Sequence, residues 1–191
     1  MTLKHCGTKE IRTERLILRR FVPEDYVYMY NNWASDDEVT KFLTWKTHSD
    51  VYVSKEITEN WVKAYENDSN YQWAITLKEK TEEPFGSIAV VFCDEDVFTF
   101  EIGYCISKKH WRKGFTSEAL QAVISFLFEN TDVNRIEAIH DVNNPNSGRV
   151  MNKCGMVFEG THRKAFRNNT GICDVNYYSI LRSEWKDKRE D

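Results

Sequence analysis

The sequence contains no apolar run of membrane-spanning length, and Met1 to Glu10 lack the apolar core of a signal peptide. It also contains no internal repeat, no low-complexity segment and no block of lysine and arginine typical of nucleic-acid-binding proteins. We therefore expect no membrane and no direct nucleic-acid partner. The net charge is −4 with both signs interspersed, which mildly favours a basic substrate.

The cysteines form no Cys-x-x-Cys pair, and they are odd in number and widely spaced: Cys6, Cys93, Cys105, Cys154 and Cys173. Reduced thiols in a cytoplasmic protein explain this pattern best. None of them has an activating neighbour in sequence. No metal is expected, because four histidines share no ligand spacing: His48, His110, His140 and His162.

The chain has 191 residues, which suits one domain with a sizeable core. Aromatic residues make up 14% and charged residues 29% of the chain, so bulk disorder is not expected. We expect a single domain over residues 11–186. It would lie between an N-terminal tail, residues 1–10, and a charged C-terminal tail, residues 187–191.

Hydrophobic spacing in the first half of the chain predicts a strand, two helices and three further strands. Leu16 to Phe21 is short and β-prone, and helical spacing follows around Tyr26–Trp33 and Ile57–Tyr65. Alternating residues then predict strands at Tyr71–Leu77, Gly86–Phe92 and Phe98–Ile106. The last two strands resemble a hairpin in an antiparallel sheet.

In the second half, helices and strands alternate. A basic loop, Lys108 to Lys113, precedes Gly114 and a strongly amphipathic helix, after which Arg135–Val142 reads as a strand. Pro145–Cys154 is predicted to be a helix, with Asn144 as its N-cap and Gly155 as its stop. Two strands follow, near Val157–Phe166 and Cys173–Leu181. This order is typical of a mixed α/β domain.

The segment from Ile106 to Ala119 is the first candidate binding site, because a strand, a glycine loop and a helix follow one another there. The first amides of a helix lack internal partners, and the helix dipole favours a negative charge beside them. A phosphate therefore fits at this position, with Gly114 allowing close approach and Arg112 and Lys113 adding charge. Taken alone, such a turn is more often simply solvated.

A second segment, Asn143 to Phe158, also lies at a strand-to-helix junction. Asn144 precedes the helix and Ser147 lies in its first turn. Helix capping alone would explain both residues. The two junctions together, about thirty residues apart, are far more specific than either one.

The combination resembles the GNAT superfamily of N-acetyltransferases, and within it the ribosomal-protein N-terminal, or Rim-type, group. Trp111 to Thr116 lies on the family's pyrophosphate loop, Gln/Arg-x-x-Gly-x-Gly/Ala. The group's Asn-x-x-Ser signature and its later Gly-Phe pair lie on Asn144, Ser147, Gly155 and Met156. Three further matches are Thr13–Leu16, Glu101–Tyr104 and Ser183–Trp185, so the resemblance covers roughly Arg12 to Trp185.

This resemblance implies an α+β fold with one mixed, mostly antiparallel central sheet flanked by helices. It implies transfer of an acetyl group from acetyl-CoA to a primary amine, most simply a protein N-terminal α-amine. The amine would attack directly in a ternary complex, without an acetyl-enzyme and without a metal. Two alternatives stay open: a small-molecule amine as acceptor, and a catalytically silent acyl-CoA-binding module. Homodimer formation is also left open.

The resemblance implies contacts to acetyl-CoA from three stretches of the chain. They are Tyr104 and Ile106; Trp111, Arg112, Lys113, Gly114, Phe115 and Thr116; and Asn144 and Ser147. A backbone amide near Ile106, where the strand is expected to diverge from its neighbour, would stabilise the developing oxyanion.

Three positions depart from the family pattern. Trp111 replaces the usual Gln or Arg, and Thr116 replaces a small residue; both are tolerable where backbone amides grip the phosphates. Met151 stands where many members carry the tyrosine that serves as general acid, and it cannot donate a proton. The family pattern therefore identifies no general acid in this sequence.

Glu101 is our candidate general base, since it faces away from Phe100 and Ile102 on the alternating strand. The alternative is an exposed glutamate or a salt-bridge partner. Ser147 is the candidate acid, with Tyr104 and Tyr177 in reserve, although a contact to pantetheine or a capping role suits Ser147 equally well. Contacts to the acceptor are expected from two regions, one with Trp33, Phe42, Trp45 and His48, the other with His162, Arg163, Lys164 and Asp174.

Overall fold

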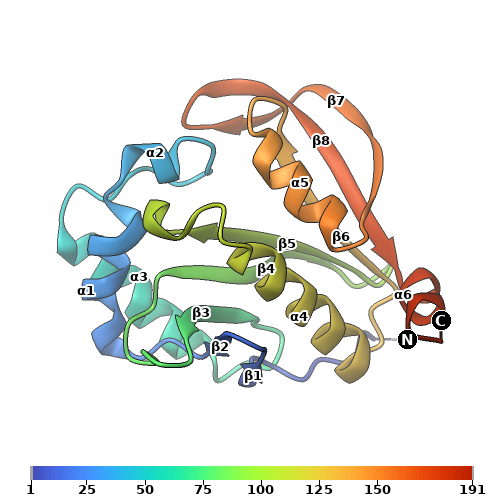
Figure 1. Cartoon of the computed structure of the whole chain (residues 1–191), viewed down its shortest axis with the longest axis horizontal. Helices are drawn as coiled ribbons and strands as arrows, with labels where there is room; N and C mark the ends of the chain where they lie inside the picture. Colours follow the sequence, from blue (N-terminus) through green and yellow to red (C-terminus); the bar gives the residue numbers. More distant parts are fainter. Residues whose placement is uncertain (1, 191) are drawn as a thin grey trace.

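The computed structural model describes residues 2–190, with side chains up to residue 186. Eight strands form one sheet in the order β1-β2-β3-β4-β5-β6-β8-β7 (Figure 1). Their bounds are Ile11–Arg12, Leu16–Arg19, Gln72–Leu77, Gly86–Asp94, Thr99–Ile106, Arg135–Asp141, Val157–Asn168 and Gly171–Leu181 for β1 to β8. Among the strands that the structure describes, only β5 and β6 pair in parallel. The predicted mixed, mostly antiparallel sheet is confirmed.

Helices cover both faces of the sheet. The longer ones are α3 (Val51–Ala64), α4 (Phe115–Asn130), α5 (Pro145–Lys153) and α6 (Arg182–Glu190), and the short ones are α1 (Tyr26–Met29) and α2 (Asp37–Thr40). Alternation along β5 directs Phe100 and Ile102 into the larger core cluster, with the inward residues of α4. Cys105, on the opposite face of β5, packs against a second cluster built from α1 and α3.

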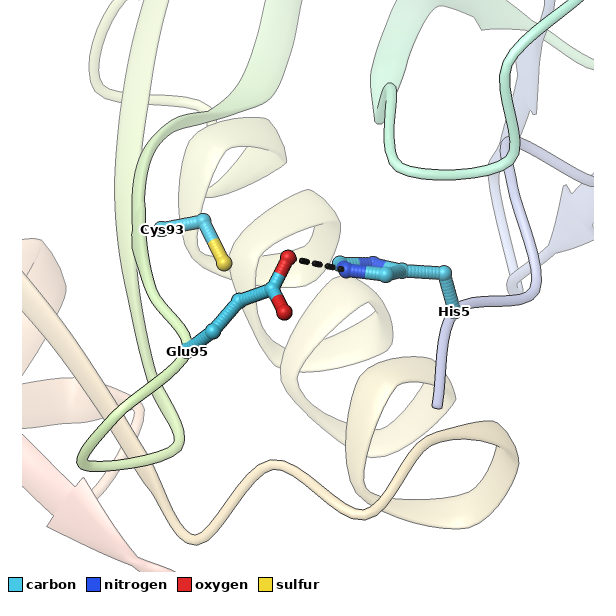
Figure 2. Close-up of side chains that lie close together, drawn as sticks. All are labelled: His5, Cys93 and Glu95. Atoms are coloured by element: carbon cyan, nitrogen blue, oxygen red, sulfur yellow. Dashed lines mark ion pairs between the residues drawn. The ribbon is translucent and has the colours of Figure 1, made fainter. Parts of the chain in front are cut away.

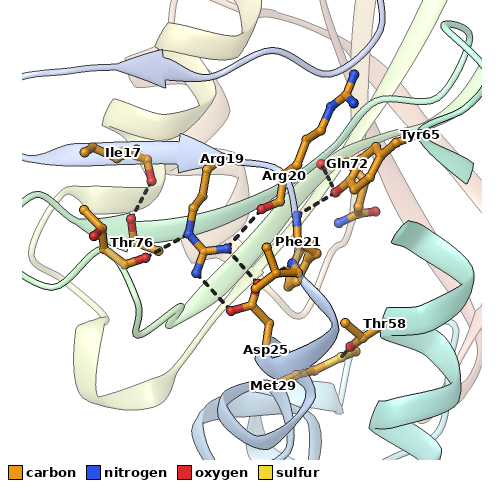
Figure 3. Close-up of polar contacts among 12 residues, drawn as sticks. Ile17, Arg19, Arg20, Phe21, Asp25, Met29, Thr58, Tyr65, Gln72 and Thr76 are labelled. Carbon is orange, nitrogen blue, oxygen red and sulfur yellow. Dashed lines mark hydrogen bonds and ion pairs between the residues drawn. The ribbon is translucent and has the colours of Figure 1, made fainter. Parts of the chain in front are cut away.

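A polar network attaches Asp25, the N-cap of α1, and Tyr65, the C-cap of α3, to the sheet (Figure 3). Arg19 on β2 donates to both carboxylate oxygens of Asp25, at 2.7 and 2.9 Å. The Tyr65 hydroxyl accepts from the Phe21 amide at 2.8 Å and donates to the Gln72 carbonyl at 2.8 Å. Because these buried groups are all paired, the helical layer is fixed against the sheet.

The helix predicted around Tyr26–Trp33 changes its winding partway along. After α1 the chain makes a π-helical turn, Tyr30–Ala34, in which Ser35 N–H bonds the Tyr30 carbonyl at 3.3 Å. The wider turn brings Ala34 to the same buried side as Met29 and Trp33, all of which are at most 2% exposed. Hydrophobic spacing alone does not distinguish this turn from an ordinary α-helix.

Residues near both ends of the chain, which the sequence predicted to be tails, take part in the described fold. Leu3 is buried, and the Thr8 hydroxyl donates to the Asn70 carbonyl and accepts from the Gln72 amide. At the other end, α6 extends to Glu190, and residue 191 lies outside the described residues. The domain boundaries stay predictions. Among residues 2–190, no helix combines the length and apolar character needed to cross a membrane.

Candidate active site

The centre of the site is the point where β5 and β6 part. The two strands pair at three positions only, and Glu101 opposite Glu137 is the last pair. Beyond it, β5 stays paired with β4 to Ile106, and β6 stays paired with β8 to Asp141 (Figure 1). The facing edges of β5 and β6 therefore present backbone donors and acceptors without a strand partner, and an extended ligand rich in amides could pair with them.

This divergence begins at Ile102, so the expectation that the strands part near Ile106 is wrong. The register of β4 helps to explain it: a bulge between Val90 and Phe92 lies opposite Glu101 and Ile102. Bulges increase local twist and bend a strand, and here the bend falls at the row where the parallel pairing stops.

The loop after β5 carries a set of backbone amides that fits a pyrophosphate. Arg112 and Gly114 are both left-handed, with φ of 61° and 81°. Within the described part of the chain, the amides of residues 112–117 donate to no backbone or side-chain acceptor. Successive free amides in such a turn, at the N-terminus of the sixteen-residue α4, form an anion-binding concavity.

Contacts on both sides hold this loop in place. Trp111 donates its indole N–H to the Ile106 carbonyl at 2.9 Å, so this departure from the family pattern gives the loop a direct bond to the end of β5. Arg15 donates to the Lys113 carbonyl at 3.0 Å and pairs with Glu118 at 2.6 Å. Its guanidinium also lies over the Phe115 ring, 4.6 Å from the centroid.

Glu118, in the first turn of α4, anchors the same loop to the start of β2. It accepts hydrogen bonds from the Thr13 hydroxyl at 2.6 Å and the Arg15 amide at 2.8 Å. Burial alone would raise the pKa of this carboxyl, but these bonds and the Arg15 charge lower it overall. Thr13–Leu16 matched the family pattern, but the sequence predicted no role for it. Nothing in the spacing of these residues indicates that they contact Glu118.

Ser147 and Tyr104 face each other across the divergence. Their hydroxyl oxygens are 2.8 Å apart, and the Tyr104 hydroxyl also donates to the Ser147 carbonyl at 3.2 Å. Burial raises the pKa of Tyr104, so its phenol stays protonated at neutral pH. Asn144 occupies the N-cap position of α5, as predicted, but its side chain makes no capping bond. Met151 is buried in the core.

Glu101 lies on the opposite face of β5 from Tyr104, at the closed end of the divergence. Burial and, secondarily, the nearby Glu137 carboxylate raise its pKa. No hydrogen bond or ion pair from its carboxylate occurs among the described residues, whereas Glu137 is paired with Arg135 at 3.0 Å. Tyr177 lies on the same face, and its own pKa is raised by burial and by these two carboxylates. Glu101 is therefore half-buried and available to a ligand.

The residues expected to contact an acceptor divide into packing and surface groups. Trp33 is fully buried, and His48 is buried with its Nδ1 2.7 Å from the Ser54 hydroxyl. By contrast, the His162 ring packs at a tilt against the Tyr177 ring, with the two ring centroids 4.1 Å apart. Asn169, at the β7–β8 turn, donates to the carbonyls of Thr40 and Trp45. This turn and the loop after α2 therefore meet.

Comparison with known proteins gives a consistent result. A family model described as acetyltransferase (GNAT) domain matches residues 15–157. The uncharacterized N-acetyltransferase p20 of Bacillus licheniformis is 32% identical over 91% of this chain and 96% of its own length. The ribosomal-protein-serine acetyltransferase of Escherichia coli is 35% identical over 44% of this chain and 46% of its own.

Comparison with solved structures shows that the fold is also shared. The ribosomal L7/L12 alpha-N-protein acetyltransferase RimL, in complex with coenzyme A, superposes with a TM-score of 0.81 at 17% identity. The match covers 92% of this chain and 99% of RimL.

Proposed function

Because the chain belongs to the GNAT family of acetyltransferases, we propose that its acceptor is the α-amine of a protein N-terminus. The chain is an acetyl-CoA-dependent N-acetyltransferase. Two similar proteins are named for acetylating ribosomal proteins, one of them at an α-amine, and these support the proposed acceptor. The observation that carries the proposal is the half-buried Glu101 carboxylate, which has no partner among the described residues.

The chemistry of the amine also favours this acceptor. An amine must be neutral to attack a thioester, which at pH 7 costs a lysine side chain about 4–5 kcal/mol and an α-amine about 1 kcal/mol. A carboxylate whose pKa is raised by burial and by Glu137 is a stronger base than an exposed glutamate. Glu101 would then remove the proton from an α-amine, directly or through a water molecule.

The cosubstrate would be held along the divergence. The amides of residues 112–117 suit the pyrophosphate, with Arg112 and Lys113 adding positive charge. The unpaired edge of β5, from Ile102 to Ile106, suits the pantetheine amides. The thioester would then lie between Glu101 on one face and the Tyr104–Ser147 pair on the other.

We assign proton donation to the departing thiolate to Ser147, backed by Tyr104. The two hydroxyls are in hydrogen-bond contact, so a proton given up by Ser147 can be replaced from the phenol once the Tyr104 O–H turns from the Ser147 carbonyl to Ser147 Oγ. This pair would supply the acid function that Met151 cannot provide. The alternative role of Ser147, a hydrogen bond to pantetheine, is compatible with the same position of its hydroxyl.

Direct attack by the amine is the proposed route, because the cysteines are poorly suited to form an acetyl-enzyme. Burial raises the pKa of Cys105 and Cys173 to about 11 and that of Cys154 to about 12. Burial also raises the pKa of Cys6 and Cys93. A cysteine nucleophile needs a lowered pKa instead.

The test is thiol release from acetyl-CoA with a panel of amines. The panel comprises peptides beginning with Ala, Ser or Met, their Nα-blocked forms, polyamines and aminoglycosides. We expect the highest kcat/KM with free-amine peptides, no turnover with blocked peptides, and intersecting initial-rate lines rather than parallel ones. Higher kcat/KM with polyamines or aminoglycosides would assign a small-molecule acceptor. Acetyl-CoA binding without turnover of any amine would indicate a silent binding module.

A further inference from the structure

Three potential metal ligands meet where the N-terminal segment passes the end of the β4–β5 hairpin. They are His5, Cys93 at the end of β4, and Glu95 in the turn that follows (Figure 2). One ligand atom from each side chain lies within 4.8 Å of the other two. His5 is far from the other two in sequence, so no ligand spacing could have revealed this cluster.

The imidazole of His5 is held in a fixed orientation. Its Nδ1 is 3.3 Å from the Tyr71 hydroxyl, and its ring stacks on Phe100 at a centroid distance of 5.9 Å. With Nδ1 donating to Tyr71, Nε2 presents its lone pair toward Glu95. A hydrogen bond on the remote ring nitrogen is the usual way in which proteins orient a metal-binding histidine.

The Nε2 atom has no hydrogen-bond partner among the described residues, although it is buried. It lies 3.6 Å from a Glu95 carboxylate oxygen, which is too long for a hydrogen bond. Two ligand atoms bound to the same Zn²⁺ are about 3.3–3.8 Å apart, because Zn²⁺ sits about 2.0–2.3 Å from each in a tetrahedron. The separation therefore matches two ligands that share an ion.

We propose that His5, Cys93 and Glu95 bind a transition-metal ion, with Zn²⁺ the best fit. Imidazole nitrogen, thiolate sulfur and carboxylate oxygen are all ordinary Zn²⁺ ligands, and a water would complete the tetrahedron. Ca²⁺ and Mg²⁺ are disfavoured, because they select oxygen ligands. On binding, the Cys93 thiol would release its proton to solvent.

The site is separate from acetyl transfer. Cys93 pairs with Phe100 on the face of the sheet that α4 covers, whereas Glu101 points to the other face. The loop proposed to bind phosphate precedes α4, a sixteen-residue helix about 24 Å long. The hairpin lies near the other end of this helix, where the Asn134 amide donates to the Phe98 carbonyl at 2.9 Å. The ion would instead link the N-terminal segment to the hairpin, so its role would be structural.

The experiment uses the full chain without any histidine tag, stripped of metal by a chelator and then titrated with Zn²⁺ and Co²⁺. We expect one ion per chain by elemental analysis, and a rise in Tm of roughly 5–10 °C with Zn²⁺ at 100 times its Kd. Co²⁺ should give a thiolate-to-metal charge-transfer band and the visible absorption of a tetrahedral site. Absence of stoichiometric binding would overturn the proposal.

Variants identify the ligands. Cys93→Ser and His5→Ala should each raise the Zn²⁺ Kd at least about 10-fold, and Cys93→Ser should abolish the charge-transfer band. Cys173→Ser is the matched control, a cysteine on β8 that contacts neither the cluster nor Tyr71 in the described structure, and it should bind as wild type. Circular dichroism and acetyl-CoA turnover report whether each variant is folded. A folded Cys93→Ser chain that binds Zn²⁺ as tightly as wild type would show that the ion is held elsewhere.

Discussion

Glu101 and Glu137 stand opposite each other on neighbouring strands, yet their surroundings differ. Glu137 is paired with Arg135, which also binds Glu159 through both carboxylate oxygens. Glu101 has no such partner among the described residues, and its pKa is raised by burial and by Glu137. The two carboxylates in this row therefore differ: Glu137 is paired with Arg135 of its own strand, whereas Glu101 has no partner among the described residues and can serve as the proposed general base.

We predict that Glu101→Gln lowers turnover by roughly 10² to 10⁴ at neutral pH, the usual worth of a general base. The affinity for acetyl-CoA should stay nearly unchanged, because Glu101 lies outside the loop at residues 112–117 that is proposed to hold the phosphates. Turnover should recover as rising pH supplies neutral amine, near pH 8 for an α-amine and near pH 10 for a lysine-like one. Rates from pH 6.5 to 9.5 test this. Equal rates for the variant and wild type across the range would make Glu101 structural.

Glu137→Gln serves as the matched control and carries its own prediction. The Glu137 carboxylate helps to raise the pKa of Glu101, so its removal should lower that pKa. Glu101 then ionises at lower pH, and the acidic limb of the kcat/KM profile should move to lower pH while the maximum rate falls far less than in Glu101→Gln. An unmoved acidic limb would assign it to a group other than Glu101.

At Gly114 we predict that replacement by Asp raises the Kd for acetyl-CoA at least about 100-fold. The new side chain brings a negative charge to the free amides and strains a backbone held at φ +81°. Gly171→Asp is the matched control, since its φ is +109°, its surroundings are open and it lies outside the loop. Ser147→Ala should cost less affinity than Gly114→Asp. Calorimetric titration measures all three, and unaltered affinity in Gly114→Asp would place the phosphates elsewhere.

At the scale of elements, the contact between α5 and β6 depends on Gly148. A Cβ at this position would lie 2.6 Å from His140 Nε2. The ring cannot move aside easily, because its Nδ1 bonds the Asp141 carbonyl at 2.8 Å and the side chain is 7% exposed. Ser147 precedes this glycine, so the close approach also sets the position of its hydroxyl beside Tyr104.

We therefore predict that Gly148→Ala destabilises the fold by about 1–3 kcal/mol, as overpacking does, despite the better helix propensity of alanine. Urea unfolding gives this free energy. In a His140→Ala background the same substitution should cost less, because the clashing ring is gone. Turnover of Gly148→Ala should also fall, through displacement of Ser147. A neutral or stabilising effect of Gly148→Ala in the wild-type background would show that α5 has room to adjust.

Amphipathic spacing predicted most of these elements well. The strand around Phe98–Ile106, the helix after Gly114 and the Pro145 helix with Gly155 at its end all appear, and Gly155 has φ +78° as a helix stop requires. Spacing could not reveal α2, whose four residues begin after the Asp36 cap and include too few apolar positions to form a pattern. Nor could it reveal the start of the strand divergence, which depends on a bulge in a neighbouring strand.

Of the proposed site, the sequence could indicate only the parts that a single local motif forms. The free amides around Gly114 follow from a loop preceding a helix, and both are local features. Arg15 with Glu118, Tyr104 with Ser147, and His5 with Glu95 are instead pairs from segments far apart in the chain. Such pairs depend on the order of strands in the sheet. No spacing rule within one segment gives that order.

At the scale of the whole molecule, the interior strands of the described sheet are joined by the fewest residue pairs between β5 and β6. Strands β1 to β5 form one part and β6, β8 and β7 the other, and only three residue pairs join β5 to β6. Helix α5 and the contact between Tyr104 and Ser147 supplement this junction. A ligand that binds both the unpaired edge of β5 and the first turns after β6 would connect the two parts of the sheet.

We predict that acetyl-CoA at 100 times its Kd stabilises the fold by about 2.7 kcal/mol, a rise in Tm of roughly 5–10 °C for a chain of this size. Because the ligand would bridge β5 and the β6–β8–β7 part, amide hydrogen exchange should slow most in β6 and α5, while the β1–β2 pair changes least. The shift should persist in the presence of a chelator, since the proposed metal site is remote and distant contributions add. In Gly114→Asp the shift should be strongly reduced at the same ligand concentration. A melting curve unmoved by saturating acetyl-CoA would contradict binding at this junction, and protection confined to β1–β3 would place the ligand on a different part of the sheet.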